Sequence, residues 1–283
     1  MQETNLFKEF FNSEKAGGIV LIIVTIVSLV LANTGFQTNY IDFWNTDLGG
    51  HTLAQYINDG LMAIFFLLIG LELEREIYKG ELSNIRNATL PIFGALGGMI
   101  IPAGIFIAFN IGTLTQSGSG IPTATDIAFA IGILSLLGNK IPLSLKVFLT
   151  ALAVIDDLGA IIIIALFYTS TIFYTNLFIA LGIFALLLVL NRLKVNNIIP
   201  YLFGGIGMWY FMLNSGVHAT ITGVLLAFAI PFGDGSSKTP SYILQHILHK
   251  PVAFIILPLF AMANTAIAID SNWHLGLLEP HSI

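Results

Sequence analysis

The chain has 283 residues, of which 56% are hydrophobic and only 10% are charged, and its mean hydropathy is +0.87. Soluble domains carry about 25% charged residues, and a chain of this size cannot bury so many apolar side chains in one core, so a water-soluble domain is excluded. The net charge of -5 argues against nucleic acid as a partner. The absence of cysteine excludes disulfides and thiolate metal sites.

Nine apolar stretches predict an all-α polytopic membrane protein that forms a single integral-membrane domain over residues 1–283. Residues 1–16 are mixed polar and predict a cytoplasmic N-terminal segment rather than a cleaved signal peptide. The fourth stretch opens with residues 117–126, whose glycines and proline predict an interrupted helix. The predicted spans are approximately 18–32, 61–75, 90–109, 121–138, 142–168, 177–190, 199–213, 216–232 and 251–268.

The basic residues test this count, because each extra or missing span would swap the side of every later loop. With nine spans, all 11 lysines and arginines lie on one side of the membrane. The N-terminus is therefore predicted in the cytoplasm and the C-terminus outside. Residues 43–53 carry a Gly49-Gly50 pair between short extended runs and predict a small external β-hairpin. Asp59 is predicted to cap the second span.

Three carboxylates lie in apolar segments, where a charge costs about 2.5–3.5 kcal/mol on insertion scales. Asp156 and Asp157 occupy the middle of the fifth span, and Asp126 follows the irregular part of the fourth. Helical neighbours point about 100° apart, so Asp156 and Asp157 face different partners. Together with Thr125 and free backbone carbonyls, these carboxylates supply hard oxygen ligands for a small cation. Since buried carboxylates also hold protons, we predict cation/proton exchange.

Three segments in this order, 123–130 (TATDIAFA), 153–160 (AVIDDLGA) and 215–220 (SGVHAT), closely resemble the NhaA family of bacterial sodium/proton antiporters, and the similarity covers nearly all 283 residues. The resemblance implies inverted repeats with interrupted helices, an architecture described for NhaA itself. It also implies an inner-membrane location, a homodimer formed through the external hairpin, and no cofactor. Asp157 would be the main sodium- and proton-binding carboxylate and Asp156 its partner. Thr125 and Asp126 would lie where two interrupted helices cross.

The resemblance also assigns a pH response to a cytoplasmic cluster, and to a histidine at the outer end of the eighth span. Histidine titrates near neutrality and suits such a role. Gln245 stands where the family pattern has glutamate, which removes one titrating group. The alternative is structural: Glu72 and Arg75 form an interfacial ion pair, and the histidines are simply solvated. The residues concerned are Glu72, Arg75, Glu76, His218, His246 and His249.

The family has about twelve spans, whereas this chain ends shortly after its ninth. The resemblance therefore implies that the second interrupted helix and a later lysine-bearing span are missing, and an inactive antiporter fragment is one alternative. An intramembrane aspartyl protease is another, but it needs a Gly-x-Gly-Asp motif that this sequence lacks. A passive cation channel would not need titrating carboxylates. We expect a secondary transporter, not an enzyme, that exchanges cytoplasmic Na+ or Li+ for external protons by alternating access.

Overall fold

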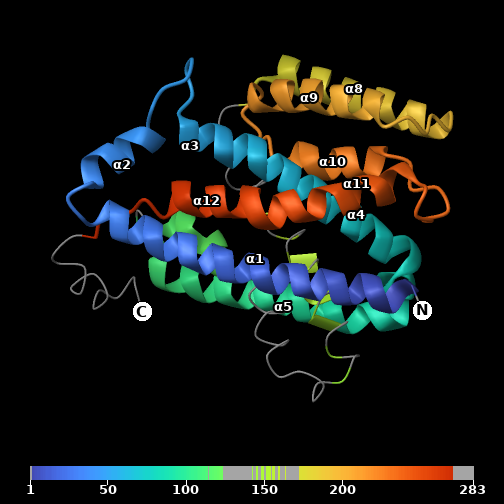
Figure 1. The fold of residues 1–283 in the computed structure, drawn as a ribbon, viewed down its shortest axis with the longest axis horizontal. Helices are drawn as coiled ribbons and strands as arrows, with labels where there is room; N and C mark the ends of the chain where they lie inside the picture. Colours follow the sequence, from blue (N-terminus) through green and yellow to red (C-terminus); the bar gives the residue numbers. More distant parts are fainter. Residues whose placement is uncertain are drawn as a thin grey trace.

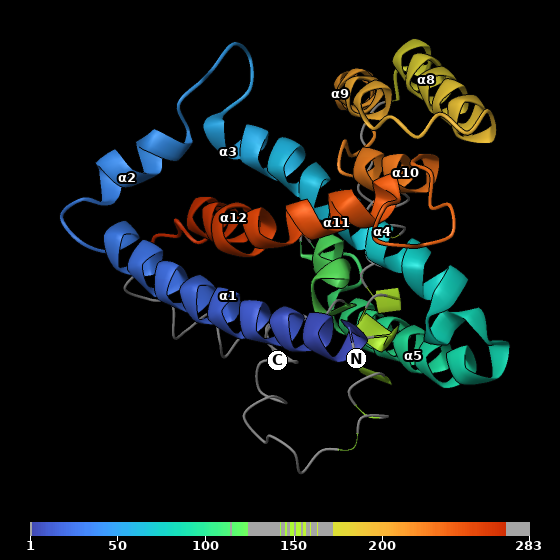
Figure 2. The ribbon, with the colours of Figure 1, turned by 45° about the vertical axis from the view of Figure 1, so that its right-hand side comes forward.

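A computed structural model describes residues 2–113, 115–123, 142, 145, 148–149, 151–153, 155–156, 159, 163 and 172–269. These residues are mostly helical and include no β-strand. In Figures 1 and 2, α4 and α10 to α12 lie between the α8 and α9 pair on one side and α1 with α5 on the other. The predicted all-α membrane class is therefore confirmed.

The helices of the described residues vary widely in length. Four segments are long and apolar enough to cross a membrane, namely 53–79, 88–110, 174–192 and 240–264. Residues 16–32 and 37–44 make a fifth if they count as one span, although they are bent by 118°. The elements are α1 (Gln2–Ala32), α2 (Gln37–Trp44), α3 (Leu53–Tyr56), the π-helical turn η1 (Ile57–Leu61), α4 (Met62–Lys79), η2 (Glu81–Ser83), α5 (Ile85–Asn110), η3 (Gln116–Thr123), α8 (Tyr174–Arg192), α9 (Ile199–Leu213), α10 (Ile221–Ala229), α11 (Pro240–Pro251), the π-helical turn η5 (Val252–Ile256) and α12 (Leu257–Asn264).

The helix bounds differ from the predicted spans where polar residues extend or interrupt a helix. The α9 helix has the predicted bounds, whereas α11 begins at Pro240, before the predicted start at 251. Pro240 suits the first helical position because its missing N–H would have no partner there. The α10 helix begins only at Ile221, since residues 214–216 form a turn and Gly216 has a φ of +83°. The predicted fourth and fifth spans lie mostly outside the described residues.

The α4 helix is the most enclosed of the candidate spans. In the 53–79 segment, 44% of the most apolar stretch of 18 residues is buried inside the protein, against 11% for the corresponding stretches of 88–110 and 174–192. It crosses α10 closely, because a Cβ at Gly70 would lie 2.6 Å from Ala227 Cβ, and a Cβ at Gly223 would meet the carbonyl oxygen of Ala63. Glycine at such a crossing lets two backbones approach, as is common between membrane helices. The pair forms the centre of the described bundle.

Polar side chains join α1 and the end of α12. Ser28 Oγ donates a hydrogen bond to the carbonyl of Met262 at 3.0 Å, and Tyr40 Oη donates to Ser28 Oγ at 2.8 Å. Asn33 Nδ2 donates to the carbonyl of Ile267 at 2.9 Å. Because lipid offers no hydrogen-bond partners, polar groups at these depths must be satisfied within the protein. These hydrogen bonds therefore hold α1 and the end of α12 next to each other.

The segment predicted as a hairpin forms a tight turn with one antiparallel bridge, between Asp47 and Thr52. The Leu48 N–H donates to the carbonyl of His51 at 2.9 Å. Gly49 and Gly50 have φ of +86° and +99°, a conformation that other residues adopt at a steric cost. The loop rises beyond the ends of α2 and α3 in Figure 1.

The predicted cap of the second span is wrong. Asp59 lies inside η1, and the helical segment already begins at Leu53. Thr52 caps it instead: its Oγ1 accepts from the Gln55 N–H at 3.2 Å, while the Thr52 N–H donates to Gln55 Oε1 at 2.7 Å. This reciprocal capping box satisfies two N–H groups that the first turn leaves open.

The Gly223→Ala variant should destabilise the crossing of α4 and α10. The added Cβ would clash with the carbonyl oxygen of Ala63, and such overpacking costs about 1–3 kcal/mol. We expect a lower midpoint of thermal unfolding in detergent, followed by circular dichroism. Gly182→Ala on α8 is the matched control, because nothing lies within 4 Å of its added Cβ. Equal midpoints for the two variants would contradict the close crossing.

Candidate functional site

One of the predicted ion-binding carboxylates lies among the described residues. Asp156 is helical and only 4% exposed, and the nearby Ala151 and Ala153 are also buried. This segment packs against α5: a Cβ at Gly94 would lie 3.1 Å from Leu152 Cδ1, and Gly159 meets the side chain of Met99. A carboxylate enclosed in this way is costly in an apolar region, which makes Asp156 a candidate functional residue.

The other three predicted ligands, Thr125, Asp126 and Asp157, lie outside the described residues. The chain leading to them is described as far as Thr123, where η3 is a 3-10 helix with non-helical angles at Pro122. Thr123 is buried, and its Oγ1 donates to the carbonyl of Gly120 at 2.6 Å. Within the described ranges, no three His, Asp or Glu side chains meet as metal ligands. The assignment of these residues to sodium stays a prediction.

The structure brings most of the predicted pH-response residues to one helix pair. Glu72, Arg75 and Glu76 lie on α4, and His246 and His249 lie on the adjacent α11. The side chain of Gln245 hydrogen-bonds to Glu72, on which Arg75 and Glu76 also act electrostatically. His246 is exposed and stacks on Tyr242, with ring centroids 6.4 Å apart and planes 7° apart.

His218 lies apart from this cluster, in the turn that precedes α10. His218 and His51 both act electrostatically on Asp59 in η1. These residues are at the end of the bundle opposite to Lys79, because α4 runs from Met62 near this end to Lys79 at the other. The predicted pH-response residues therefore occupy two ends of the bundle.

An amide pair at this second end was not predicted. Asn58 in η1 and Asn264 at the end of α12 exchange hydrogen bonds through both side chains, at 3.1 and 2.7 Å. Trp209 Nε1 on α9 donates to the backbone carbonyl of Asp59 at 2.8 Å. The wider spacing of a π-helical turn leaves such a carbonyl open to an outside donor. No periodicity in the sequence marks a π-helical turn, so the pairing could not be read from it.

Glu74 is a second residue that the sequence analysis did not single out. It is only 3% exposed, and Ser241 Oγ on α11 donates to its Oε2 at 3.4 Å. Glu74 lies two residues from Glu72 on α4. Glu74 contacts Ser241 near the start of α11, whereas Glu72 contacts Gln245 further along the same helix. The signal that could have found it is its position in the polar end of an otherwise apolar span.

Comparison with known proteins gives a consistent result over the whole chain. Residues 8–282 match the family described as Na+/H+ antiporter 1. The Na(+)/H(+) antiporter NhaA of Flavobacterium psychrophilum is 70% identical over 283 residues, which are 100% of this chain and 74% of that protein. The NhaA of Cytophaga hutchinsonii is 66% identical over 100% of this chain and 73% of its own length. The NhaA of Dechloromonas aromatica is 59% identical over 98% and 72%.

Proposed function

The chain belongs to the Na+/H+ antiporter 1 family, and we propose that it exchanges sodium for protons by alternating access, with Asp157 as the carboxylate that holds the two ions in turn. The observation that carries this proposal is the enclosed Asp156 in a helix packed on α5. Asp157 is its neighbour in the sequence, and the hydropathy pattern predicts both carboxylates in the same span. Transport, rather than catalysis of a reaction, is what the family does.

In the proposed cycle a proton and a sodium ion compete for the same oxygens. Deprotonated Asp157, with Asp156 and Thr125, would bind Na+ through hard oxygen ligands, without any cofactor. Protonation of the carboxylate removes its charge and releases the cation. If the site opens to only one side at a time, inward movement of protons drives outward movement of Na+ or Li+. Asp126 would balance the ends of the interrupted helix beside the site.

The proposed orientation places the N-terminus and the Lys79 end of α4 in the cytoplasm of a bacterial inner membrane. The distribution of basic residues supports this orientation. In the proposed orientation α4 and α8 both run towards the cytoplasm, so their C-terminal ends should lie on the same side. Lys79 and Asn191, at these two ends, line one cavity. Phe43 and Leu48 are 54% and 51% exposed beside the external turn. Such apolar side chains suit a homodimer contact at residues 43–53, which we also propose.

We further propose that the α4 and α11 cluster adjusts activity to pH. The cluster holds a carboxylate and two histidines on adjacent helices, and a change of charge at a helix contact alters how the helices pack. Gln245, which bonds to Glu72, would transmit such a change between α4 and α11. His218 would act separately from the other end.

The Asp157→Asn variant should abolish sodium-driven proton flux, because it removes the charge and the proton site while it preserves the volume. The measurement is flux in proteoliposomes that carry residues 1–283, scanned across pH, with sodium binding in detergent as a second readout. Asp42→Asn, which removes an exposed carboxylate from α2, is the control and should retain flux. Flux or sodium binding that survives in Asp157→Asn would refute the assignment.

The Glu72→Gln variant should make the dependence of flux on pH less steep, by up to about one proton, the number that one carboxylate contributes. Gln245→Ala breaks the same contact without removing a titrating group, so its profile should keep the original steepness. Flux in proteoliposomes across pH measures both. The proposal fails if the two variants change the profile in the same way, since the contact and not the charge would then matter.

Single cysteines test the orientation directly, because the chain has none of its own. A membrane-impermeant maleimide should label Leu48→Cys in intact cells, since Leu48 is exposed on the external turn. It should label Ser237→Cys, in the loop between α10 and α11, only after the membrane is opened. The opposite pattern would reverse the proposed orientation.

A further inference from the structure

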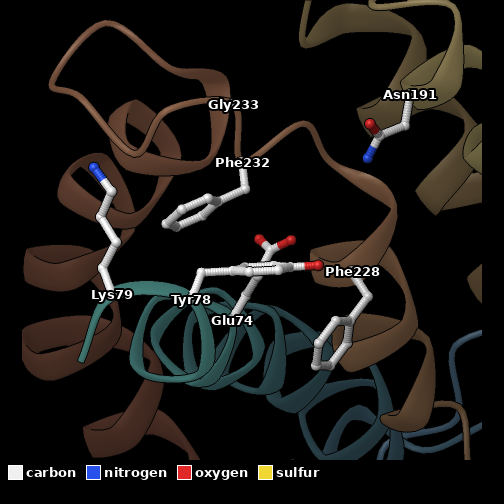
Figure 3. A pocket seen from close by; sticks show the side chains of 7 residues that line it. All are labelled: Glu74, Tyr78, Lys79, Asn191, Phe228, Phe232 and Gly233. Carbon is white, nitrogen blue, oxygen red and sulfur yellow. The ribbon is translucent and has the colours of Figure 1, made fainter. Parts of the chain in front are cut away.

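An open cavity of about 480 Å³ lies at the Lys79 end of the bundle. It is formed where α4, α8 and the loop after α10 meet, and it is separate from the Asp156 segment, which packs on α5. Figure 3 shows the Glu74 carboxylate next to the ring of Tyr78 in this view, with the ring of Phe232 to its upper left and that of Phe228 to its lower right. The lining residues are Glu74, Tyr78, Lys79, Asn191, Phe228, Phe232 and Gly233.

Glu74 has no cationic partner among the described residues. Its partner there is the hydroxyl of Ser241, at 3.4 Å, and a neutral hydroxyl does not balance a carboxylate charge. A buried charge without an opposite charge is strongly unfavourable. Either a proton or a cation that enters the open cavity can remove this penalty.

Three helix ends add negative potential at the same place. Tyr78 and Lys79 belong to the last turn of α4, Asn191 to the last turn of α8, and Phe228 to the last turn of α10. The C-terminal end of a helix carries a partial negative charge from its unpaired carbonyls, and it stabilises nearby cations. The convergence of three such ends selects against an anion and for a cation.

The aromatic side chains that line the cavity favour an organic cation over an inorganic one. Tyr78 and Phe232 lie with ring centroids 5.1 Å apart and planes 32° apart, and Phe228 forms another wall. Ring faces attract organic ammonium groups and also cover their apolar carbons. A hard inorganic cation instead needs several oxygen ligands at once, and Glu74 is the one carboxylate of the described lining.

Lys79 does not fill the site itself. In Figure 3 its Nζ extends away from the Glu74 carboxylate. Its charge acts on Asp234 in the loop after α10, and hydrogen bonds from the side chain and backbone of Ser236 hold the pKa of Asp234 below its usual range. Asp234 is therefore ionised at neutral pH and offers Lys79 a partner outside the cavity.

We propose that this cavity is a binding site for a small organic primary ammonium ion, held by the Glu74 carboxylate and by the faces of Phe228 and Phe232. The site is distinct from the ion-exchange carboxylates and goes beyond antiport. Its ligand reaches it from the side of the membrane that the Lys79 end faces.

The test is binding of putrescine, a short primary diamine, to the full chain in detergent, measured by isothermal titration calorimetry at constant ionic strength. Glu74→Gln should weaken binding by at least about tenfold, because it removes the charge-assisted hydrogen bond. Phe232→Leu should weaken it several-fold while the carboxylate remains. Uncharged 1,4-butanediol, of nearly the same shape, should not bind measurably.

Two carboxylate controls separate this site from other acidic positions. Asp42→Asn removes the same charge at the other end of the molecule and should bind putrescine like the wild type. Asp157→Asn should also bind normally, whatever it does to sodium flux. The proposal is overturned if the wild type does not bind, if both Glu74→Gln and Phe232→Leu bind unchanged, or if only Asp157→Asn loses binding. If Glu74→Gln does not fold, Phe232→Leu decides alone.

Discussion

The described bundle depends on the close approach of α4 and α10. At Gly70 and Gly223 a side chain would collide with the facing backbone or with Ala227, so this is where backbone meets backbone. In lipid, apolar contacts between helices gain little from the hydrophobic effect, and close packing supplies much of the association. The rest of the arrangement follows: α9 packs on α10, where Leu226 meets Gly205, and α11 covers another side of α4. Both neighbours hold positions set by this crossing.

The contact between the 53–79 and 240–264 segments differs in kind, because polar side chains make it at three levels. Glu74 meets Ser241 at one end, Glu72 meets Gln245 one turn further along α11, and Asn58 meets Asn264 at the opposite end. Hydrogen bonds to a carboxylate depend on its protonation, whereas apolar packing does not. The crossing of α4 with α10 is therefore suited to stay fixed, and the contact of α4 with α11 is suited to respond to its surroundings.

Hydropathy and charge predicted the membrane class and most of the described spans, because lipid imposes length and apolarity on each helix. The bounds of α9 agree with the prediction, whereas the start of α11 at Pro240 was missed because its first turns are amphipathic. Glu72, Arg75 and Glu76 could be grouped from the sequence, since they share one turn of α4. The contact of Glu72 with Gln245 depends on which helices become neighbours. Glu74 and Asn58 were not predicted for the same reason. The motifs around Asp126 and Asp157 indicated the family without any geometry.

The two π-helical turns, η1 and η5, have a geometric consequence for the long helices that contain them. Each such turn accommodates one extra residue, which rotates everything beyond it by about 100° around the helix axis. In the 53–79 segment the turn η1 contains Asn58 and precedes Glu72, and in the 240–264 segment the turn η5 lies between Gln245 and Asn264. Each of the two antiparallel helices therefore has one such rotation of its side chains around the helix axis. Deleting a single residue from either turn would leave the helix intact but would point one of its two contacts away from the partner.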